Sequence, residues 1–226
     1  MNCVPFAFCD AVTSILGKTT LTRFSQLGNF AKRCSWKCAF TGHFDNRVEL
    51  DLRVFPIGIN WFYALEGGSG SLIELEEVQK TPRKYLHLQG LSFDKSRHGL
   101  ASSLDEIKSV LNFVRPHVDG WTLLRLCRTD APKEVLVDLL SPFRTAPFRF
   151  ISLWRYEEAF EEILREQIKL STLRSFATYD KSQPAVELET EYNRIQTEAR
   201  LARSDAGGGR RMLSVINKHL VRCNRQ

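Results

Sequence analysis

The stretch Gly17-Lys18-Thr19 has the residue types that close a phosphate-binding loop, in which backbone N–H groups and a lysine surround the phosphates of a nucleotide. That motif needs another glycine five residues before Gly17, where this chain has Val12. A β-branched residue resists the positive-φ turns of such a loop. The segment before Gly17 also has apolar residues at helical spacing, whereas the motif follows a strand. We therefore interpret the stretch as a turn between two helices, with Gly17 as a C-cap, and predict no bound nucleotide.

Two cysteines at helical spacing could form half of a metal site. Cys34 and Cys38 lie four residues apart, and His43 follows them. A structural zinc ion needs four ligands, and the sequence offers no second pair of suitable spacing. We therefore expect buried thiols and no metal.

Acidic residues crowd the start of one expected helix, at Glu157, Glu158, Glu161 and Glu162. Paired carboxylates can act as general acid and base. Carboxylates at a helix start also suit the helix dipole, and we interpret these as a solvated face. The glycine-rich segment 205–211 could approach a phosphate but follows no strand, so we interpret it as a flexible joint.

No enzyme motif is recognisable elsewhere in the chain. It has neither a Gly-x-Ser-x-Gly turn nor a His-Glu-x-x-His pair. The five histidines lie far apart in sequence. We therefore predict no catalytic residues, no cofactor and no enzymatic activity.

Composition favours a globular intracellular protein. The 226 residues are 43% hydrophobic and 26% charged, and no apolar run approaches the ~20 residues that a membrane span needs. No signal peptide is expected, because no basic region precedes the first apolar stretch. The six cysteines are scattered, which is typical of a reducing compartment. We expect a cytoplasmic or nuclear location without membrane attachment.

The net charge of +6 is concentrated near the C-terminus. Residues 194–226 contain eight Lys or Arg and two Asp or Glu, which accounts for the whole excess. A basic tail can attract nucleic acid, but no aromatic residue follows Tyr192 to stack on bases. We interpret the tail as a solvated end, so a nucleic-acid partner is the third and least favoured hypothesis.

The first third of the chain predicts helices and then a hairpin. Residues 3–44 have helical spacing of apolar residues throughout. Residues 48–54 and 59–65 each alternate apolar and polar side chains, and a Pro/Gly turn separates them. Two such runs predict a β-hairpin.

From residue 85 onwards the pattern alternates between strands and helices. Strands are expected at 85–93, 122–128, 148–154 and 173–179, and helices at 102–114, 130–143 and 156–168. A capping box of Ser103 and Glu106 begins the first of these helices, and Asp130 is expected to cap the second.

The expected strands repeat with a period of 25 residues. The repeat aligns two series, Leu123, Phe148 and Leu173 and then Leu126, Ile151 and Phe176. One strand and one helix per unit is typical of a leucine-rich-repeat-like stack. An ordinary α/β sheet with units of similar length is the alternative. The predicted class is α/β of mixed type.

The N-terminal segments 4–16, 21–40 and 43–47 resemble the degenerate F-box start of a large group of nematode proteins. Such starts have a Val-Pro or Leu-Pro opening, an apolar helix, a loop, a leucine-rich helix and a late tryptophan. The hairpin with Trp61 and Tyr63 looks like the β segment that follows the F-box in this family. Residues 160–176 look like its repeat-containing half.

The resemblance covers about residues 3–180 and implies a three-helix F-box-like unit at 3–44, then a hairpin and irregular βα repeats of about 25 residues at 45–180. It does not extend over residues 181–226, where the charge pattern predicts a basic tail that is disordered or partly helical. It implies an adaptor that binds a Skp-family protein and presents an unknown target protein to a cullin-RING ubiquitin ligase. The apolar anchors for the Skp-family protein would be Val4, Pro5, Phe6, Val12, Ile15, Leu21, Leu27 and Trp36.

Each of these side chains could equally belong to the interior of the chain, because a pattern does not reveal which surface it meets. The alternative function is therefore a repeat-type protein-binding module without a ligase link. In that protein the N-terminal helices would only cover the edge of the sheet.

Overall fold

The computed structural model describes residues 5–16, 20–23, 35–95, 98–170 and 172–206, with side chains as far as residue 201. Several residues singled out by the sequence lie outside these ranges: Val4, Gly17, Lys18, Thr19, Leu27 and Cys34.

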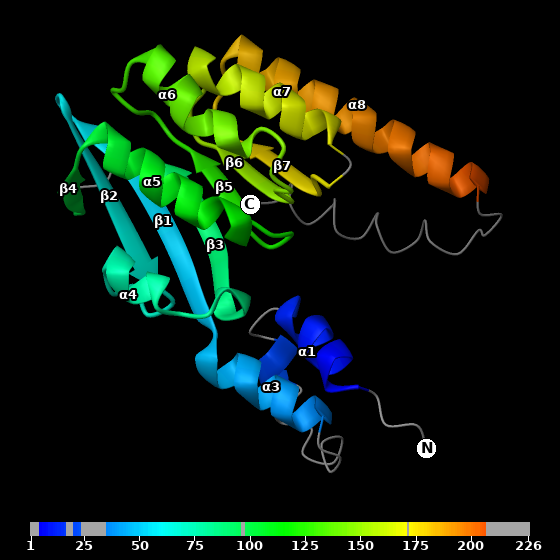
Figure 1. Cartoon of the computed structure of the whole chain (residues 1–226). Coiled ribbons are helices and arrows are strands. Elements are labelled where there is room, and N and C mark those ends of the chain that lie inside the picture. Colours follow the sequence, from blue (N-terminus) through cyan, green and yellow to red (C-terminus); the bar gives the residue numbers. More distant parts are fainter. Residues whose placement is uncertain (1–4, 17–19, 24–34, 96–97, 171, 207–226) are drawn as a thin grey trace.

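The described residues form a mixed α/β fold around a seven-stranded sheet, as the alternating pattern predicts (Figure 1). The strand order is β4-β2-β1-β3-β5-β6-β7. The strands are β1 (Val48–Ile57), β2 (Asn60–Gly67), β3 (Leu86–Phe93), β4 (Leu100–Ser102), β5 (Leu123–Leu126), β6 (Phe150–Leu153) and β7 (Ser175–Thr178). Strand β2 is antiparallel to β1 and β4, whereas β1, β3, β5, β6 and β7 run parallel.

The predicted hairpin is confirmed, with its turn slightly later than the pattern indicates. Ile57 pairs with Asn60, and Gly58 takes a φ of 63°, which suits a residue without a Cβ. Pro56 lies inside β1 opposite Trp61. On its other side β1 pairs with β3 only as far as Val54, so the missing N–H of Pro56 breaks no ladder bond there.

Helices cover one face of this sheet, where α5, α6 and α7 lie in front of the strands in Figure 1. The helices of the sheet region are α4 (Leu75–Gln79), α5 (Leu104–Val114), α6 (Lys133–Leu140), α7 (Glu161–Lys169) and α8 (Gln183–Ala206), with single 3-10 turns η1 (Arg83–Tyr85), η2 (Arg115–His117), η3 (Ser141–Phe143) and η4 (Glu158–Phe160). A single apolar cluster joins this helical layer to the sheet and includes Leu91, Leu124, Ile151 and Leu164.

The predicted helix starts have different outcomes. The capping box before α5 is confirmed, because Ser103 Oγ accepts from the Glu106 N–H and the Glu106 carboxylate accepts from the Ser103 N–H. The prediction for Asp130 is wrong, since α6 begins after Pro132. The exposed Asp130 carboxylate pairs instead with Lys95 at 2.6 Å.

The parallel βα units are stacked, but the predicted period is wrong at its first step. Leu124 pairs with Ile151 and Ile151 with Phe176, so the units are 27 and then 25 residues long. The expected partner of Ile151, Leu126, pairs with Leu153 instead. A shift of two residues keeps a strand's side chains on the same face, so apolar alternation alone does not detect it.

The segment assigned to a basic tail contains a long helix, α8. Its residues Ala185, Leu188 and Tyr192 belong to the apolar cluster, and the helix packs against α7 and β7. The α/β fold therefore continues past residue 180.

Gln167 on α7 supplies a testable contribution to this packing. Its side chain is fully buried, and its amide donates to the carbonyls of Phe143, Arg144 and Ala146 at 3.1, 2.8 and 2.9 Å. Gln167→Leu leaves these buried carbonyls without their donor. We expect a loss of about 1–3 kcal/mol in the free energy of unfolding, measured by urea titration. The exposed Gln183→Leu is the control and should change it by no more than about 0.5 kcal/mol.

Candidate interaction site

Helix α1 (Phe6–Ser14) turns a small, partly polar side toward the rest of the chain. Pro5 caps it, and the Pro5 carbonyl accepts from the N–H groups of Phe8 and Cys9 at 3.1 and 3.2 Å. Only Cys9 and Thr13 are buried on this helix, one turn apart. The Thr13 hydroxyl donates to the Cys9 carbonyl at 2.6 Å, which satisfies it inside the helix.

The larger apolar side chains of this segment point outward. Phe6 is 48% exposed, Phe8 56% and Ile15 68%. Phe8, Val12 and Ile15 have helical spacing, so they line one side of α1 and its C-cap. We call Phe8, Val12 and Ile15 the α1 stripe; Phe6, two residues before Phe8, is exposed on a different side of the helix. Its periodicity was recognisable in the sequence, but its outward direction was not.

Aromatic rings extend the stripe onto helix α3 (Ser35–Asn46). The Trp36 ring meets the Phe8 ring edge to face, with centroids 6.1 Å apart. The Trp36 ring also stacks on Phe40, with centroids 5.6 Å apart. Phe8 is thus the stripe residue that contacts the late tryptophan, although the proposed anchors did not include it.

The proposed anchors divide into three groups. Pro5, Phe6 and Ile15 are exposed, and Val12 and Trp36 are half-buried, so these could contact a partner. Leu21 is fully buried inside the chain, so its assignment as a surface anchor is corrected to a core residue. Val4 and Leu27 lie outside the described residues.

Polar contacts hold the inner side of α1. The Asp10 carboxylate accepts from His43 Nε2 on α3 at 3.0 Å and from Lys84 Nζ on η1 at 3.3 Å. The fully buried His43 ring also meets the Tyr85 ring at 5.1 Å. Burial lowers the pKa of His43, although Asp10 opposes this shift. His43 is therefore a structural contact between α1, α3 and η1.

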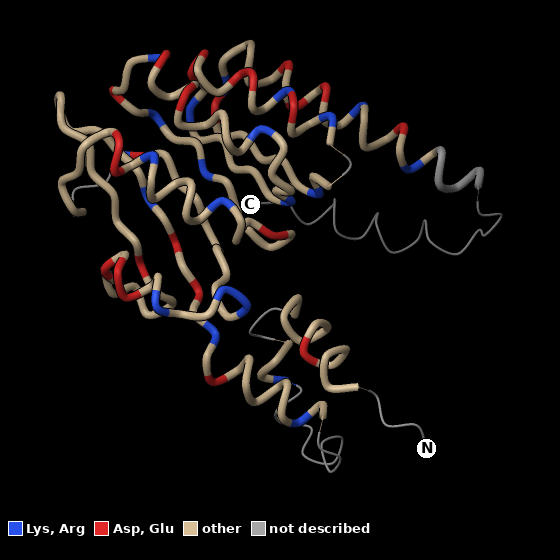
Figure 2. Tube along the Cα trace, in the orientation of Figure 1, with Lys and Arg blue, Asp and Glu red and all other residues tan. Residues whose placement is uncertain are grey.

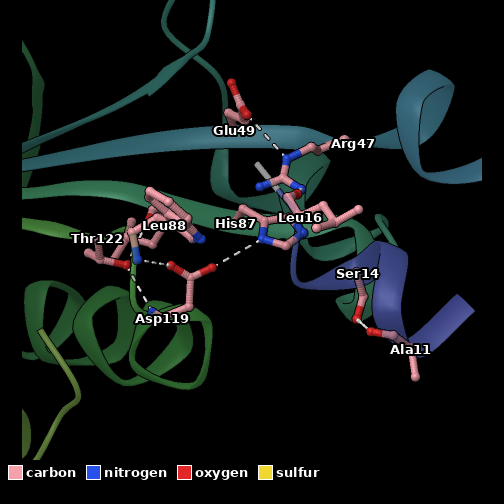
Figure 3. Close-up of polar contacts among 10 residues, drawn as sticks. Ala11, Ser14, Leu16, Arg47, Glu49, His87, Leu88, Asp119 and Thr122 are labelled. Carbon is pink, nitrogen blue, oxygen red and sulfur yellow. Dashed lines mark hydrogen bonds and ion pairs between the residues drawn. The ribbon is translucent and has the colours of Figure 1, made fainter. Parts of the chain in front are cut away.

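A second polar group joins α1 to the sheet, and Figure 3 shows it in close-up. We call Arg47, Glu49, His87, Asp119 and Thr122 the junction cluster. Arg47 lies between α3 and β1, and its guanidinium donates to Glu49 Oε1 at 3.1 Å and to the Leu16 carbonyl. The side chains of Arg47 and Glu49 are only 4% and 9% exposed. A buried ion pair thus sits where the helices meet the sheet.

The Asp119 side of the junction cluster orders the loop before β5. The Asp119 carboxylate accepts from His87 Nδ1 at 3.3 Å and from the Trp121 N–H at 2.7 Å. Burial alone would raise the pKa of Asp119, but these hydrogen bonds lower it overall. Thr122 Oγ1 accepts from the Asp119 N–H and donates to the Leu88 carbonyl at 2.6 Å.

The acidic helix start is largely the solvated face we expected, with the side chains of Glu158 and Glu162 70% and 54% exposed, and its carboxylates also contact neighbouring groups. Glu157 accepts from the Thr129 N–H at 2.6 Å, and Glu158 pairs with Lys133. The partners of Glu161 and Glu162 are Arg165 and Arg144. Within the part of the chain that the structure describes, no group of three His, Cys, Asp or Glu could hold a metal ion, and no helix is long and apolar enough to cross a bilayer.

Comparisons with protein-family models, with curated proteins and with solved structures give no match to this chain. The class of protein is therefore defined by its fold alone, a mixed α/β protein with parallel βα units and an N-terminal helical unit.

The buried ion pair predicts a large stability effect at Arg47. Arg47→Ala leaves the Glu49 carboxylate buried without its partner, and removing one member of such a pair costs about 3–5 kcal/mol. The measurement is the free energy of unfolding in urea. Arg53→Ala is the matched control, because its pair with Glu66 is 39% and 21% exposed and should be worth no more than about 1 kcal/mol. Equal losses in the two variants would contradict the importance of the Arg47 contact.

Two buried histidines predict loss of stability on acidification. Burial lowers the pKa of His43, and burial and then Arg83 lower the pKa of His117. Below pH about 6.5 the unfolded chain therefore binds protons before the folded chain does. The free energy of unfolding should fall with pH by at most about 1.4 kcal/mol per unit for each histidine.

Urea titrations across this pH range test the effect of the two histidines. His43→Gln and His117→Gln should each flatten the slope. Asp119, whose pKa is lowered, contributes only near and below pH about 4, so its titration is separate. An unchanged slope in both variants would exclude the histidines as its cause.

Proposed function

We propose that this protein is a non-enzymatic protein-interaction adaptor, an F-box-like substrate-recognition subunit of a cullin-RING ubiquitin ligase. The N-terminal helices dock a Skp-family protein, and the α/β region holds a target protein. The protein works inside the cell, in the cytoplasm or the nucleus. It acts by proximity, because holding a target near the ligase raises its effective concentration there.

The observation that carries this proposal is the outward direction of the α1 stripe. A helix that served only as a cover for the sheet edge would turn its phenylalanines inward. Here Phe6, Phe8 and Ile15 are each about half exposed or more, and Trp36 extends them on α3. Aromatic side chains at the centre of an interface supply much of its binding energy. Burial of this apolar surface by a partner is therefore favourable.

The non-enzymatic part of the proposal has support from the engaged side chains. The carboxylates of the acidic helix start contact neighbouring side chains, and Asp119 orders a loop. Burial raises the pKa of Cys127 to about 11, so this thiol is a poor nucleophile at neutral pH.

The alternative, a repeat-type binding module without a ligase link, has support from Leu21. That side chain is buried within the chain, as the alternative expects. The alternative also expects Phe6 to be buried, whereas this side chain is 48% exposed. The two functions therefore differ in what contacts the exposed apolar side chains of α1.

Co-purification with a Skp-family protein tests the docking. The double variant Phe6→Asp/Phe8→Asp places charges at the two exposed phenylalanines of α1 and replaces no buried side chain. We expect it to weaken binding at least about tenfold, as for the loss of interface hot spots. The control is Ile59→Asp in the hairpin turn, whose side chain is 95% exposed.

The control should bind like the wild type, and both variants should keep the wild-type melting temperature. If the wild-type chain does not bind the Skp-family protein, or if the double variant binds as well as the control, the docking proposal is wrong. The repeat-type module would then be the better description.

A further inference from the structure

The amino ends of the parallel strands gather a second set of side chains, separate from the α1 stripe except at Ile15. A groove of about 810 Å³ runs between the end of α1 and this edge of the sheet. Its walls include Arg83 and Lys84 from η1, Trp121 from the loop before β5, and Arg149 from the loop before β6. Figure 2 shows basic positions at η1, beside this edge of the sheet.

Trp121 is an exposed aromatic side chain on an ordered loop. It is 56% exposed, although its N–H donates to Asp119 at 2.7 Å. The Asp119 carboxylate accepts from His87, and the Asp119 N–H donates to Thr122 Oγ1. The Thr122 hydroxyl donates in turn to the Leu88 carbonyl on β3. Because the backbone at Trp121 is already fixed, a partner that covers the indole does not have to order this loop.

The Arg149 side chain packs over the same loop, which is possible because Gly120 has no Cβ. A Cβ at Gly120 would lie only 2.4 Å from Arg149 Nε, so the side chain of Arg149 lies directly on this glycine. The Arg149 carbonyl accepts from the N–H groups of Arg174 and Ser175 at 2.8 and 2.9 Å, which fixes its backbone. The guanidinium is thus positioned before any ligand arrives.

Two arginines of the groove are unpaired among the described residues, although Asp119 lies in the same wall. The side chains of Arg83 and Arg149 have no hydrogen-bond or ion-pair partner among the residues that the structure describes. Lys84 is the exception, because it pairs with Asp10. Burial and then Arg83 lower the pKa of His117, so this histidine favours its neutral form more than an ordinary histidine does.

We infer that this groove binds an acidic segment of a partner protein, with an apolar side chain on Trp121 and carboxylates on Arg83 and Arg149. Guanidinium groups bind carboxylates through two parallel hydrogen bonds. Asp119 and Asp10 beside these cations would repel a continuous phosphate backbone, so spaced carboxylates fit better than nucleic acid. An open groove lined by Ile15 and Trp121 suits an extended chain with apolar residues between its charges.

This inference deepens the proposed adaptor function, since the groove would hold the target. Its test uses no Skp-family protein, so the two can fail separately. If the chain binds the acidic peptide but no Skp-family protein, the inference about the groove stands and only the proposed link to a ligase is wrong.

The probe is a fluorescein-labelled peptide rich in glutamate with interspersed leucine, titrated with the full chain and followed by fluorescence anisotropy. The salt concentration is about 0.1 M, where the Debye length is about 10 Å. A peptide with glutamine in place of glutamate and an oligothymidine of similar length are the comparison ligands. We expect saturable binding of the glutamate peptide alone, weakening as salt rises.

The matched variants use the two ends of one strand. Arg149 precedes β6 and Arg155 follows it, and Arg155 lies outside the groove. The double variant Arg83→Ala/Arg149→Ala should weaken peptide binding at least tenfold. The single variant Arg149→Ala should also weaken it, whereas its matched control Arg155→Ala should change it less than twofold. Gly120→Ala displaces the Arg149 side chain without changing the net charge and should also weaken binding at least threefold.

The inference is overturned if the glutamate peptide shows no saturable binding, or if Arg155→Ala weakens binding as much as Arg149→Ala. Tighter binding of the oligothymidine than of the peptide would overturn it in favour of nucleic acid. Far-UV circular dichroism and melting curves show that each variant is folded before titration. Should Gly120→Ala fail to fold, the comparison of Arg149 with Arg155 still decides, because both are partly or fully exposed.

Discussion

The buried guanidinium of Arg47 is the contact on which the arrangement of this molecule depends. A buried cation is tolerated only if it is paired and its N–H groups have acceptors. Arg47 meets this requirement with Glu49 on β1 and the Leu16 carbonyl just beyond α1. Because Arg47 itself joins α3 to β1, one side chain relates the helices to the first strand of the sheet. Any other position of α1 would take the Leu16 carbonyl away from this buried guanidinium and leave it with Glu49 alone.

This constraint explains why the apolar stripe faces outward. Asp10 on the inner side of α1 must meet His43 and Lys84, and Leu16 must present its carbonyl to Arg47. With these contacts made, helical geometry directs Phe8, Val12 and Ile15 to another side. The described interior of the helical unit is correspondingly small and partly polar, with Cys9, Thr13, Leu21, Ala39 and His43. Polar contacts orient the helices, and most of the large apolar side chains described on α1 remain available to a partner.

Periodicity was enough to predict the α/β part of the fold, because each strand and helix buries one face against a common core. The hairpin and the capping box at Ser103 were likewise local patterns. The prediction was wrong where two arrangements satisfy the same pattern. A strand shifted by two residues buries the same kinds of side chain, so Leu126 was aligned with Ile151 instead of Leu153. The apolar spacing on α1 was recognised, but the pattern of a single helix does not indicate which of its sides faces the rest of the chain.

The distribution of charge along the sequence did not predict the cationic groove, which is recognisable only once the fold is known. Residues before 194 sum to zero, which gave no reason to expect a basic surface there. In a parallel sheet, however, the residues that precede successive strands meet at one edge. Arg83 and Lys84 lie close before β3, Arg149 immediately before β6 and Arg174 immediately before β7. Some of the compensating carboxylates, those of Asp130, Glu158 and Glu162, belong to the connections that follow β5 and β6, where they pair with Lys95, Lys133 and Arg144, whereas Asp119 stays at the amino edge. The part of the chain before residue 194, which is neutral overall, thus gains a group of cations at one edge of the sheet, because parallel pairing sorts residues by their position relative to each strand.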